Sequence, residues 1–383
     1  ANTEAASGRT ETNANTEAAS GRTEADANTE AISDKTEADA NTEAASGRTE
    51  ADANTEMASG RTEADANTAV YHVPVLLHES IEALITDPDG IYADATFGGG
   101  GHSRAILERL GGNGRLLAFD QDEDAVRNCG IKDDRLILVR NNFRFIENFA
   151  IFEKPRLMTG REDTQKTNQS AFLDGVLADL GVSSHQFDTA ERGFSFRFDA
   201  PLDMRMNSEA GMSAADIVNG YEEEDIEKIL RLYGEVENSR KLANLICKAR
   251  ESKAISTTGD LQNAMAPALP KFAEHKALAK IFQALRIEVN HEMKSLEKFL
   301  YGAAAVLKPG GRLVVITYHS LEDRMVKNFI KSGNISGDMG KDMFGNVKAP
   351  LKAVNRKPIV PAETEISANT RARSAKLRIA ERI

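Results

Sequence analysis

Four consecutive glycines occupy positions 98–101, within the stretch DATFGGGGHS at 94–103. Glycine contributes nothing to side-chain packing, but it allows positive φ angles and a close approach of the backbone to another molecule. A glycine run between an apolar stretch and a helix N-terminus therefore indicates a loop that binds a nucleotide-like ligand. Asp120 ends the next apolar stretch, GRLLAFD at 114–120. A carboxylate at that place can accept hydrogen bonds from both hydroxyls of a ribose.

The loop and Asp120 fit two ligands, a nicotinamide dinucleotide and S-adenosyl-L-methionine (SAM), and a tight turn without a ligand is the third alternative. A G-x-G-x-x-G pattern that begins at Gly98 would need glycine at position 103, where this chain has Ser103. His102, at the expected helix N-terminus, is either a ligand contact or a turn residue. Phe143 either flanks an adenine ring or belongs to the core. Spacing alone leaves these alternatives open.

Apolar stretches and helical patterns alternate from Val70 onward. Runs rich in Leu, Ile and Val that are separated by helices predict a parallel sheet covered on both faces, a Rossmann-like α/β fold. In this architecture ligands bind at the carboxyl ends of the strands, which singles out the glycine loop, Asp120, Phe143, Asp179 and His319. The expected strands are 90–97, 114–120, 135–143, 174–181 and 312–320, the last after a KPGG breaker at 308–311, and the expected helices include 102–110, 123–129 and 276–307.

Residues 182–278 lack the strand alternation and contain helical patterns such as 222–252. Their length is too great for one crossover connection, so we expect an inserted, mostly helical subdomain that recognises the substrate. The insertion divides the sheet domain into two parts, 69–181 and 279–383. The polar stretch 153–170 is expected to be a mobile loop.

The chain begins with five tandem copies of a thirteen-residue unit, seen in full as ANTEAASGRTEAD at 14–26. The copies fill residues 1–65 and hold 10 Glu and 5 Asp against 4 Arg and 1 Lys, a net charge of −10. Because the whole chain carries −11, the other 318 residues carry only −1. Ile32 and Met57 are the only large apolar side chains in the repeats, so residues 1–68 are expected to form a disordered tail.

The two cysteines, Cys129 and Cys247, have no CxxC or Cys/His ligand spacing around them. This predicts reduced thiols in a cytoplasmic protein and no metal site. No apolar run of 18 or more residues occurs, so we expect no membrane span.

Six stretches occur in the order found in one enzyme family. They are VPVLLHE (73–79), ATFGGGGHS (95–103), LADLGVSSHQFDTAERGFSFRFDAPLDMRMN (177–207), FQALRIEVNHE (282–292), HSLEDRMVK (319–327) and ARSAKLRIAER (372–382). Over Tyr71 to Ile383 the chain resembles the ribosomal RNA small subunit methyltransferase H family. The resemblance implies a SAM-dependent methyltransferase sheet that methylates the exocyclic N4 amine of a cytidine in 16S rRNA, with the small ribosomal subunit as partner.

The resemblance also implies which residues bind SAM. They are Gly100, Gly101 and His102 in the loop, Asp120 at the ribose, and Phe143, Asp179 and Gln186 around the rest of the cofactor.

Two departures from the family pattern stand near these residues. His185 occupies a position where many members have proline, and TYHS at 317–320 replaces a more common Ser-Phe pair before His-Ser. We expect neither departure to touch a cofactor contact.

Methyltransferases that act on amino groups often carry an Asp/Asn-Pro-Pro-aromatic tetrad after the fourth strand. Here that place reads Asp179-Leu180-Gly181-Val182, so the tetrad is absent and the amine must be held in another way. Structural hydrogen bonding is at least as good an interpretation for each of the catalytic candidates. These candidates are Asp179, Ser184, Asp203, Asn290 and His319.

The stretch ERGFSFRFDAPLDMRMN at 191–207 alternates aromatic and basic residues, which could stack and bind an unpaired base. The alternation also fits a strand with one buried face. The basic stretch 341–383, with 10 Lys and Arg against 4 Asp and Glu, suits phosphate contacts. The expected RNA contacts in the first stretch are Arg192, Phe194, Phe196 and Arg197.

Two other functions are alternatives on this sequence. One is an NAD-dependent oxidoreductase on the same sheet, and the other is a non-catalytic RNA-binding factor in ribosome assembly. The glycine loop with Asp120 speaks against the second, because an assembly factor needs no cofactor.

Overall fold

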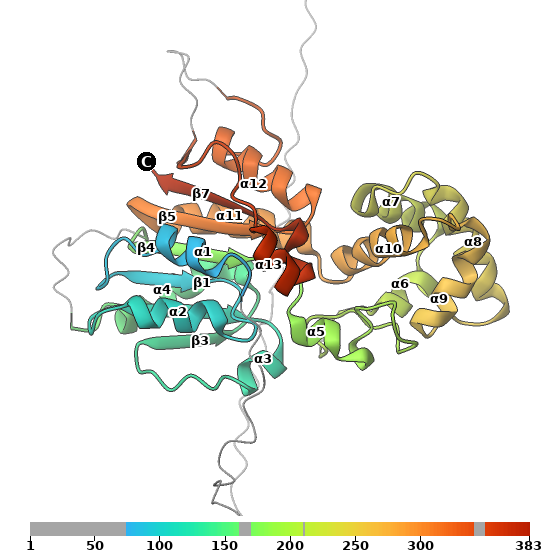
Figure 1. The fold of residues 1–383 in the computed structure, drawn as a ribbon, viewed down its shortest axis with the longest axis horizontal. Coiled ribbons are helices and arrows are strands. Elements are labelled where there is room, and N and C mark those ends of the chain that lie inside the picture. The colour runs from blue at the N-terminus through green and yellow to red at the C-terminus, as the bar shows by residue number, and fades with distance from the viewer. Residues whose placement is uncertain (1–73, 161–169, 210, 341–348) are drawn as a thin grey trace, which may run out of the picture. The chain divides into compact units, whose positions relative to one another are not determined.

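A computed structural model of the protein describes residues 74–160, 170–209, 211–340 and 349–383 (Figure 1). The expected tail, 1–68, lies outside these residues. The strands are β1 (Ile91–Asp94), β2 (Arg115–Asp120), β3 (Leu136–Arg140), β4 (Leu173–Asp179), β5 (Leu307–Thr317), β6 (Leu351–Ala353) and β7 (Lys376–Arg382). They form a seven-stranded sheet in the order β3-β2-β1-β4-β5-β7-β6. The α/β class predicted from the alternation is confirmed.

The strands β1 to β5 pair parallel with one another, but the far edge of the sheet is antiparallel. β7 pairs antiparallel with both β5 and β6, and Lys376 lies opposite Thr317. The five strands expected from the sequence are therefore parallel, as predicted, whereas the antiparallel edge formed by β6 and β7 was not expected. The charged residues of KLRIAER, the sequence of β7, interrupt the apolar pattern by which a strand is recognised. The fold accommodates two of these charges because Asp323 pairs with both Lys376 and Arg378.

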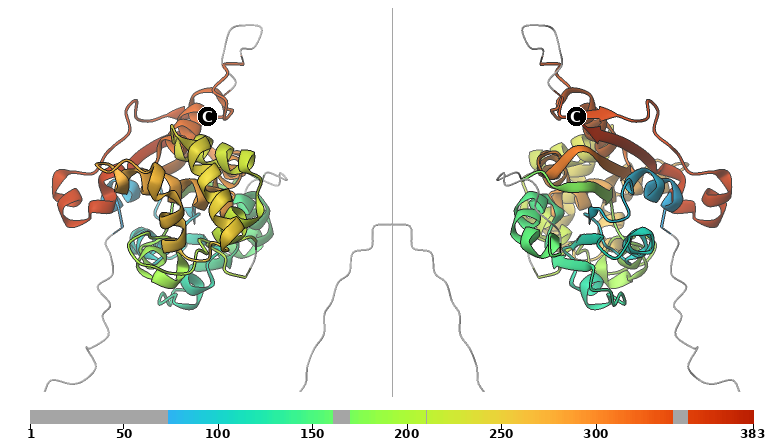
Figure 2. Two further views of the ribbon diagram at one scale, coloured as in Figure 1. Left: turned by 90° about the vertical axis from the view of Figure 1, so that its right-hand side faces the viewer. Right: turned by 90° about the vertical axis from the view of Figure 1, so that its left-hand side faces the viewer.

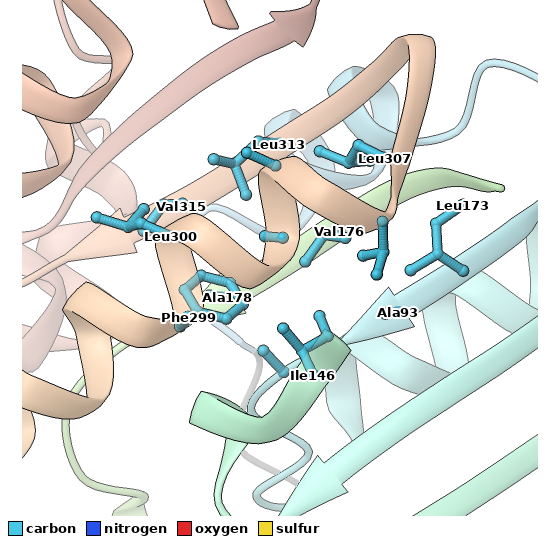
Figure 3. Packing of buried hydrophobic residues seen from close by; sticks show 14 of the residues in the cluster. Ala93, Ile146, Leu173, Val176, Ala178, Phe299, Leu300, Leu307, Leu313 and Val315 are labelled. Carbon is cyan, nitrogen blue, oxygen red and sulfur yellow. The ribbon is translucent and has the colours of Figure 1, made fainter. Parts of the chain in front are cut away.

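Helices cover both faces of the sheet (Figure 2). One face carries α1 (Leu77–Leu84) and α2 (Gly101–Arg109). The other carries α4 (Ile146–Leu157), α11 (Glu292–Val306) and α12 (Ser320–Ser332). Figure 3 shows Phe299 of α11 close to Ala178 of β4 in this second core. Apolar residues on both sides of the central strands explain why these strands read as continuous apolar runs.

Three boundaries differ from those expected. The stretch 276–307 forms two helices, α10 (Glu274–Val289) and α11, because His291 between them adopts a left-handed conformation with φ 49°. KPGG follows α11 but belongs to β5, where Gly310 has φ 81° and the pairing with β4 shifts its register. Such a bulge lets the strand tolerate a turn sequence. α4 extends to Leu157, into the expected loop 153–170, of which 161–169 lies outside the described residues.

After β4 the chain forms a mostly helical region, as predicted. Its elements are α5 (Ser184–Asp188), the 3-10 helix η2 (Ala190–Arg192), α6 (Ala214–Gly220), α7 (Glu223–Gly234), α8 (Ser239–Ser252), α9 (Thr258–Met265), η3 (Ala266–Ala268) and α10. Ser213 and Thr257 begin α6 and α9 with capping boxes. The apolar side chains of this helical region form a separate core, to which α10 contributes Leu285 and Val289. The expected boundary at 278/279 falls inside α10.

The order of the strands reverses at β1. The chain passes from β1 outward to β2 and β3, and then returns to place β4 on the other side of β1. A reversal of this kind opens a crevice at the carboxyl ends of the two strands, where ligands bind in open α/β sheets. The short elements around the sheet are α3 (Glu123–Arg127), η1 (Phe143–Phe145), α13 (Glu363–Ala368) and η4 (Thr370–Ser374). Among the described residues, no helix has the length and apolar character required to cross a bilayer.

Candidate functional site

The glycine loop joins β1 to α2, and its conformation has causes within the chain itself. Gly98 and Gly100 have φ angles of 52° and 75°, which residues with side chains rarely adopt. A Cβ at Gly101 would lie only 2.3 Å from the ring of Pro74. Gly99 is exposed, and a Cβ there would have no atom of the described chain within 4 Å. The loop therefore leaves the backbone at Gly99 accessible to a ligand.

The carboxylate of Asp120 ties the glycine loop to the loop after β2. Its Oδ2 accepts the N–H of Gly98 and its Oδ1 accepts the N–H of Asp122, both at 2.8 Å. Burial raises the pKa of Asp120 to about 6, and these two hydrogen bonds oppose the rise. Each carboxylate oxygen has a further lone pair, so Asp120 can still accept ribose hydroxyls. Its cofactor contact stays a prediction.

Asp94, the last residue of β1, is a buried carboxyl group that the sequence analysis did not single out. Its Oδ2 accepts the hydroxyl of Ser103 at 2.6 Å, and its Oδ1 accepts the N–H of Thr96 at 3.0 Å. Burial raises the pKa of Asp94. The signal was present in the sequence, because Asp94 is a carboxyl group within an apolar run, four positions before the first glycine of the loop.

Asp179, the last residue of β4, is flanked by side chains from two neighbouring elements. Tyr318, directly after β5, donates its hydroxyl to Asp179 Oδ1 at 2.8 Å. His102 Nδ1, in the first turn of α2, lies 3.7 Å from Asp179 Oδ2. Burial raises the pKa of Asp179 to about 6, whereas His102 and the Tyr318 hydroxyl lower it. Burial also lowers the pKa of His102 and raises that of Tyr318.

The contact between Tyr318 and Asp179 corrects one expectation. Tyr318 belongs to the TYHS departure, which was expected to touch no cofactor contact, yet its hydroxyl binds a carboxylate expected to contact SAM. The strands β4 and β5 are neighbours in the sheet, which spacing in the sequence does not reveal. The other departure, His185, is exposed, with Nε2 3.7 Å from Asp124 Oδ2.

Gln186 reaches from α5 to the loop after β2. Its Oε1 accepts the N–H of Ser183 at 3.1 Å in a capping box, and its Nε2 donates to Asp122 Oδ2 at 2.7 Å. Arg192 reaches the same carboxylate oxygen at 3.0 Å. Sequence reasoning missed Asp122, although the acidic run QDED after the second strand carries it. Asp122 thus connects two residues that were expected to serve the cofactor and the RNA.

The guanidinium of Arg192, expected to bind RNA, is largely buried among groups of the chain itself. It contacts the carboxylates of Asp122 and Asp124. It also donates to the carbonyl oxygens of Arg205 and Met206, at 2.9 and 3.0 Å. These contacts hold the stretch around Met206 against the loop after β2, so the structure gives Arg192 an internal role.

The stretch 191–207 is not a strand, and both the turn at Gly193, with φ 69°, and the irregular backbone after it interrupt the alternation. Phe194 is buried in the helical core. Phe196 packs edge-on against Phe282, with 5.4 Å between ring centroids. Arg197 is exposed, and of the four expected RNA contacts it is the one whose side chain faces solvent.

Two of the catalytic candidates are held in hydrogen bonds that organise the backbone. Asp203 binds Arg205 through both carboxylate oxygens, at 2.8 Å each, and this pairing lowers the pKa of Asp203 although burial opposes it. Asn290 accepts the N–H of Met206 at 2.7 Å and donates to the carbonyl of Met204 at 2.8 Å. Ser184, the first residue of α5, is half-buried.

His319, the fifth candidate, belongs to a buried charged network. Its Nδ1 accepts the N–H of Glu322 at 3.3 Å, and its Nε2 lies 3.1 Å from Glu322 Oε1. Arg286 donates to both oxygens of Glu292, at 2.8 and 2.9 Å. Atoms of Glu292, His319 and Glu322 lie within 4.8 Å of one another, close enough for a metal site. The ion pairs explain the cluster without an ion, and the metal-free centre stays an expectation.

Phe143 was expected to end the third strand, but β3 ends at Arg140 and Phe143 begins η1. Its ring packs edge-on against Phe299, with 5.3 Å between centroids. Phe143 therefore packs against the core but is only partly buried. It follows the carboxyl end of β3 in the chain.

Several basic groups near the C-terminus are engaged in the fold. Arg378 pairs with Asp323, and Arg382 donates to the carbonyls of Ala304 and Pro350. Fewer basic side chains of 341–383 are therefore free to bind phosphate than the sequence suggested. Residues 341–348 of this stretch lie outside the described residues.

Comparison with known proteins identifies the family. The model of the MraW methylase family matches residues 69–383. Ribosomal RNA small subunit methyltransferase H of Bacteroides fragilis is 57% identical over 312 residues, which are 82% of this chain and 97% of that protein. The protein of the same name from Bacteroides thetaiotaomicron is also 57% identical, with the same coverage. The chain belongs to the MraW methylase family.

Proposed function

We propose that the protein transfers the methyl group of SAM to the exocyclic N4 amine of a cytidine in 16S rRNA of the small ribosomal subunit. Membership of a methylase family supports methyl transfer, and the name of the close relatives supports the rRNA substrate. In the structure, the observation that carries the proposal is an acidic edge, made by Asp94, Asp120 and Asp179. These three residues end the neighbouring strands β1, β2 and β4.

The acidic edge suits SAM better than a dinucleotide. SAM carries a sulfonium and an ammonium group, and carboxylates attract both, whereas they repel the pyrophosphate of a dinucleotide. The position of the third dinucleotide glycine is held by Ser103, which donates to Asp94. The same edge therefore speaks against the NAD-dependent oxidoreductase.

When bound, SAM supplies a methyl group that is open to attack by a nucleophile. Asp120 would hold the ribose hydroxyls through its remaining lone pairs, and the exposed backbone at Gly99 allows a close approach. The Gln186–Asp122 hydrogen bond fixes the loops after β4 and β2 relative to each other. Holding the two reactants in contact is the main contribution that such a site makes to the rate.

The chain must also handle the target amine, which is a poor nucleophile because its lone pair is delocalised into the cytosine ring. An acceptor on the amine protons localises that pair, and one group must finally take a proton. Among the five candidates, Asp179 best suits this task. It stands at the acidic edge, its side chain is 22% exposed, and with a pKa of about 6 it is ionised at neutral pH yet still basic.

The deciding experiment is transfer of tritium from methyl-labelled SAM to naked 16S rRNA and to assembled small subunits, followed by identification of the labelled nucleoside. We expect N4-methylcytidine, with the preferred substrate shown by the faster reaction. Stabilisation by NAD but not by SAM in a thermal shift would favour the oxidoreductase. RNA binding without any methyl transfer would favour the assembly factor. Because the substrate is the small ribosomal subunit, we place the activity in the cytoplasm.

A further inference from the structure

The side chain of Tyr318 bridges the ends of two neighbouring strands. Its hydroxyl donates to Asp179 Oδ1 at 2.8 Å, and its backbone N–H donates to Glu322 Oε2 at 2.8 Å. Glu322 is itself held by His319 at the start of α12. The ring of Tyr318 packs against the core on the α1–α2 face. Both the backbone and the hydroxyl of Tyr318 are thus fixed.

We propose that Tyr318 is a positioning residue for Asp179. The hydroxyl of Tyr318 holds the Asp179 carboxylate in one orientation and in its ionised form, for SAM binding and methyl transfer. This inference rests on the proposed function. It adds a residue that follows β5, on the far side of Asp179 from the glycine loop. Tyr318 acts through Asp179 and is not proposed to touch the cofactor.

The charges around Asp179 explain why a donor matters here. Asp94 from β1 and Glu322 from α12 are both carboxyl groups, and both raise the pKa of Asp179 in addition to its burial. His102 from α2 opposes them, but burial lowers the pKa of His102 and so favours its neutral form. The Tyr318 hydroxyl is then the group that reliably offers a hydrogen to the ionised carboxylate.

Geometry supports the same assignment. Tyr318 occupies Oδ1, whereas His102 lies 3.7 Å from Oδ2, beyond ordinary hydrogen-bond distance. One oxygen of Asp179 is therefore anchored and the other keeps a free acceptor direction. Tyr318→Phe keeps the ring and removes the hydroxyl that anchors Asp179, so it is a conservative test.

The first test is SAM affinity of the full-length protein by calorimetry between pH 5.5 and 8.5. Tyr318→Phe should weaken binding about three- to tenfold at pH 7, and should shift the low-pH loss of affinity upward by about one unit. The matched control is Tyr301→Phe, the same change at an exposed tyrosine that packs on Phe329. It should leave the SAM affinity and its pH profile unchanged. A wild-type affinity and pH profile in Tyr318→Phe would overturn the proposal.

A double-mutant cycle separates positioning from a loss of packing. In the Asp179→Ala background, which removes the acceptor of the Tyr318 hydroxyl, Tyr318→Phe should have no further effect on SAM affinity beyond about twofold. An effect as large as in the wild type would overturn the proposal, because Tyr318 would then act independently of Asp179. Replacement of Tyr318 by 3-fluorotyrosine keeps the ring and strengthens the donor, so the low-pH loss should move downward. This variant also serves if Tyr318→Phe folds poorly.

Failure of the Tyr318 proposal can be distinguished from failure of the proposed function. Wild-type protein that binds SAM but transfers no methyl group to small-subunit RNA would refute the proposed substrate and leave the binding test of Tyr318 valid. Wild-type protein that binds no SAM at all would refute both.

Discussion

The N–H of Gly98 donates to the carboxylate of Asp120 at 2.8 Å, so the glycine loop and the residue expected at the ribose form one unit. A second hydrogen bond joins Asp120 to the N–H of Asp122, which in turn binds Gln186. The orientation of the carboxylate and the shape of the loop therefore depend on each other. A change at Asp120 should disturb both.

Replacing Asp120 by alanine should weaken SAM binding about ten- to a hundredfold, which corresponds to roughly 1.5–3 kcal/mol for hydrogen bonds to a charged group. Calorimetry measures the dissociation constant directly. Asp134→Ala, at an exposed aspartate, is the matched control and should bind SAM as the wild type does. An unchanged constant for Asp120→Ala would refute its place in the cofactor site.

In the ligand-free protein, Asp120 and Asp179 should each contribute less to stability as the pH rises from about 4 to about 6. The pKa values of Asp120 and Asp179 are about 6 in the folded chain, above their ordinary value of 3.8. Folding therefore favours their protonated forms, and this contribution is complete below pH about 4 and lost as the pH passes 6. Urea unfolding of Asp179→Asn should show that the variant gains stability relative to the wild type over this interval, by at most about 3 kcal/mol. A relative loss would contradict the raised pKa.

Arg192→Ala should destabilise the protein and also weaken SAM binding, because it removes the guanidinium that binds both Asp122 and the carbonyls of Arg205 and Met206. We expect a loss of about 1.5–3 kcal/mol in unfolding free energy. Arg197→Ala, at an exposed arginine in the same stretch, should leave stability and SAM affinity unchanged and lower methyl transfer to RNA. Thermal melting and tritium transfer check both. Equal changes in melting temperature and SAM affinity in the two variants would contradict the structural role that the contacts of Arg192 indicate.

The buried pair Arg286–Glu292 should matter more for stability than the exposed pair Arg324–Glu235. Arg286→Leu leaves a buried carboxylate without its partner and should cost about 3–5 kcal/mol. Arg324→Leu should cost at most about 1 kcal/mol, because solvent screens that pair. Urea unfolding of the two variants provides the comparison, and similar costs would contradict the difference in burial.

Deleting residues 1–65 should leave the melting temperature and the methyl transfer rate nearly unchanged. The repeats hold almost no large apolar side chains and so have nothing to pack against the rest of the chain. Thermal melting of the shortened protein is the measurement, and a drop of several degrees would show that the repeats dock on the folded part.

The sequence by itself determined the class of the fold and the residues at one end of its sheet. Alternating apolar runs indicated the strands β1 to β5, since burial on both faces requires continuous apolar side chains. The glycine loop, Asp120 and Asp179 were also predictable, because each lies at the carboxyl end of one of these runs. Local patterns suffice where one short segment carries both the structure and the chemistry.

Tertiary structure decided what each of these side chains contacts. Tyr318 and Asp179 lie 139 positions apart in the chain and meet only because β4 and β5 are neighbours. Arg192 looked like an RNA contact from its alternation with phenylalanines, yet its partners include Asp122, which follows β2. A side chain's hydrogen-bond partners depend on which elements pack together, and that is set by the burial of apolar surface over the whole chain rather than by the residues beside it.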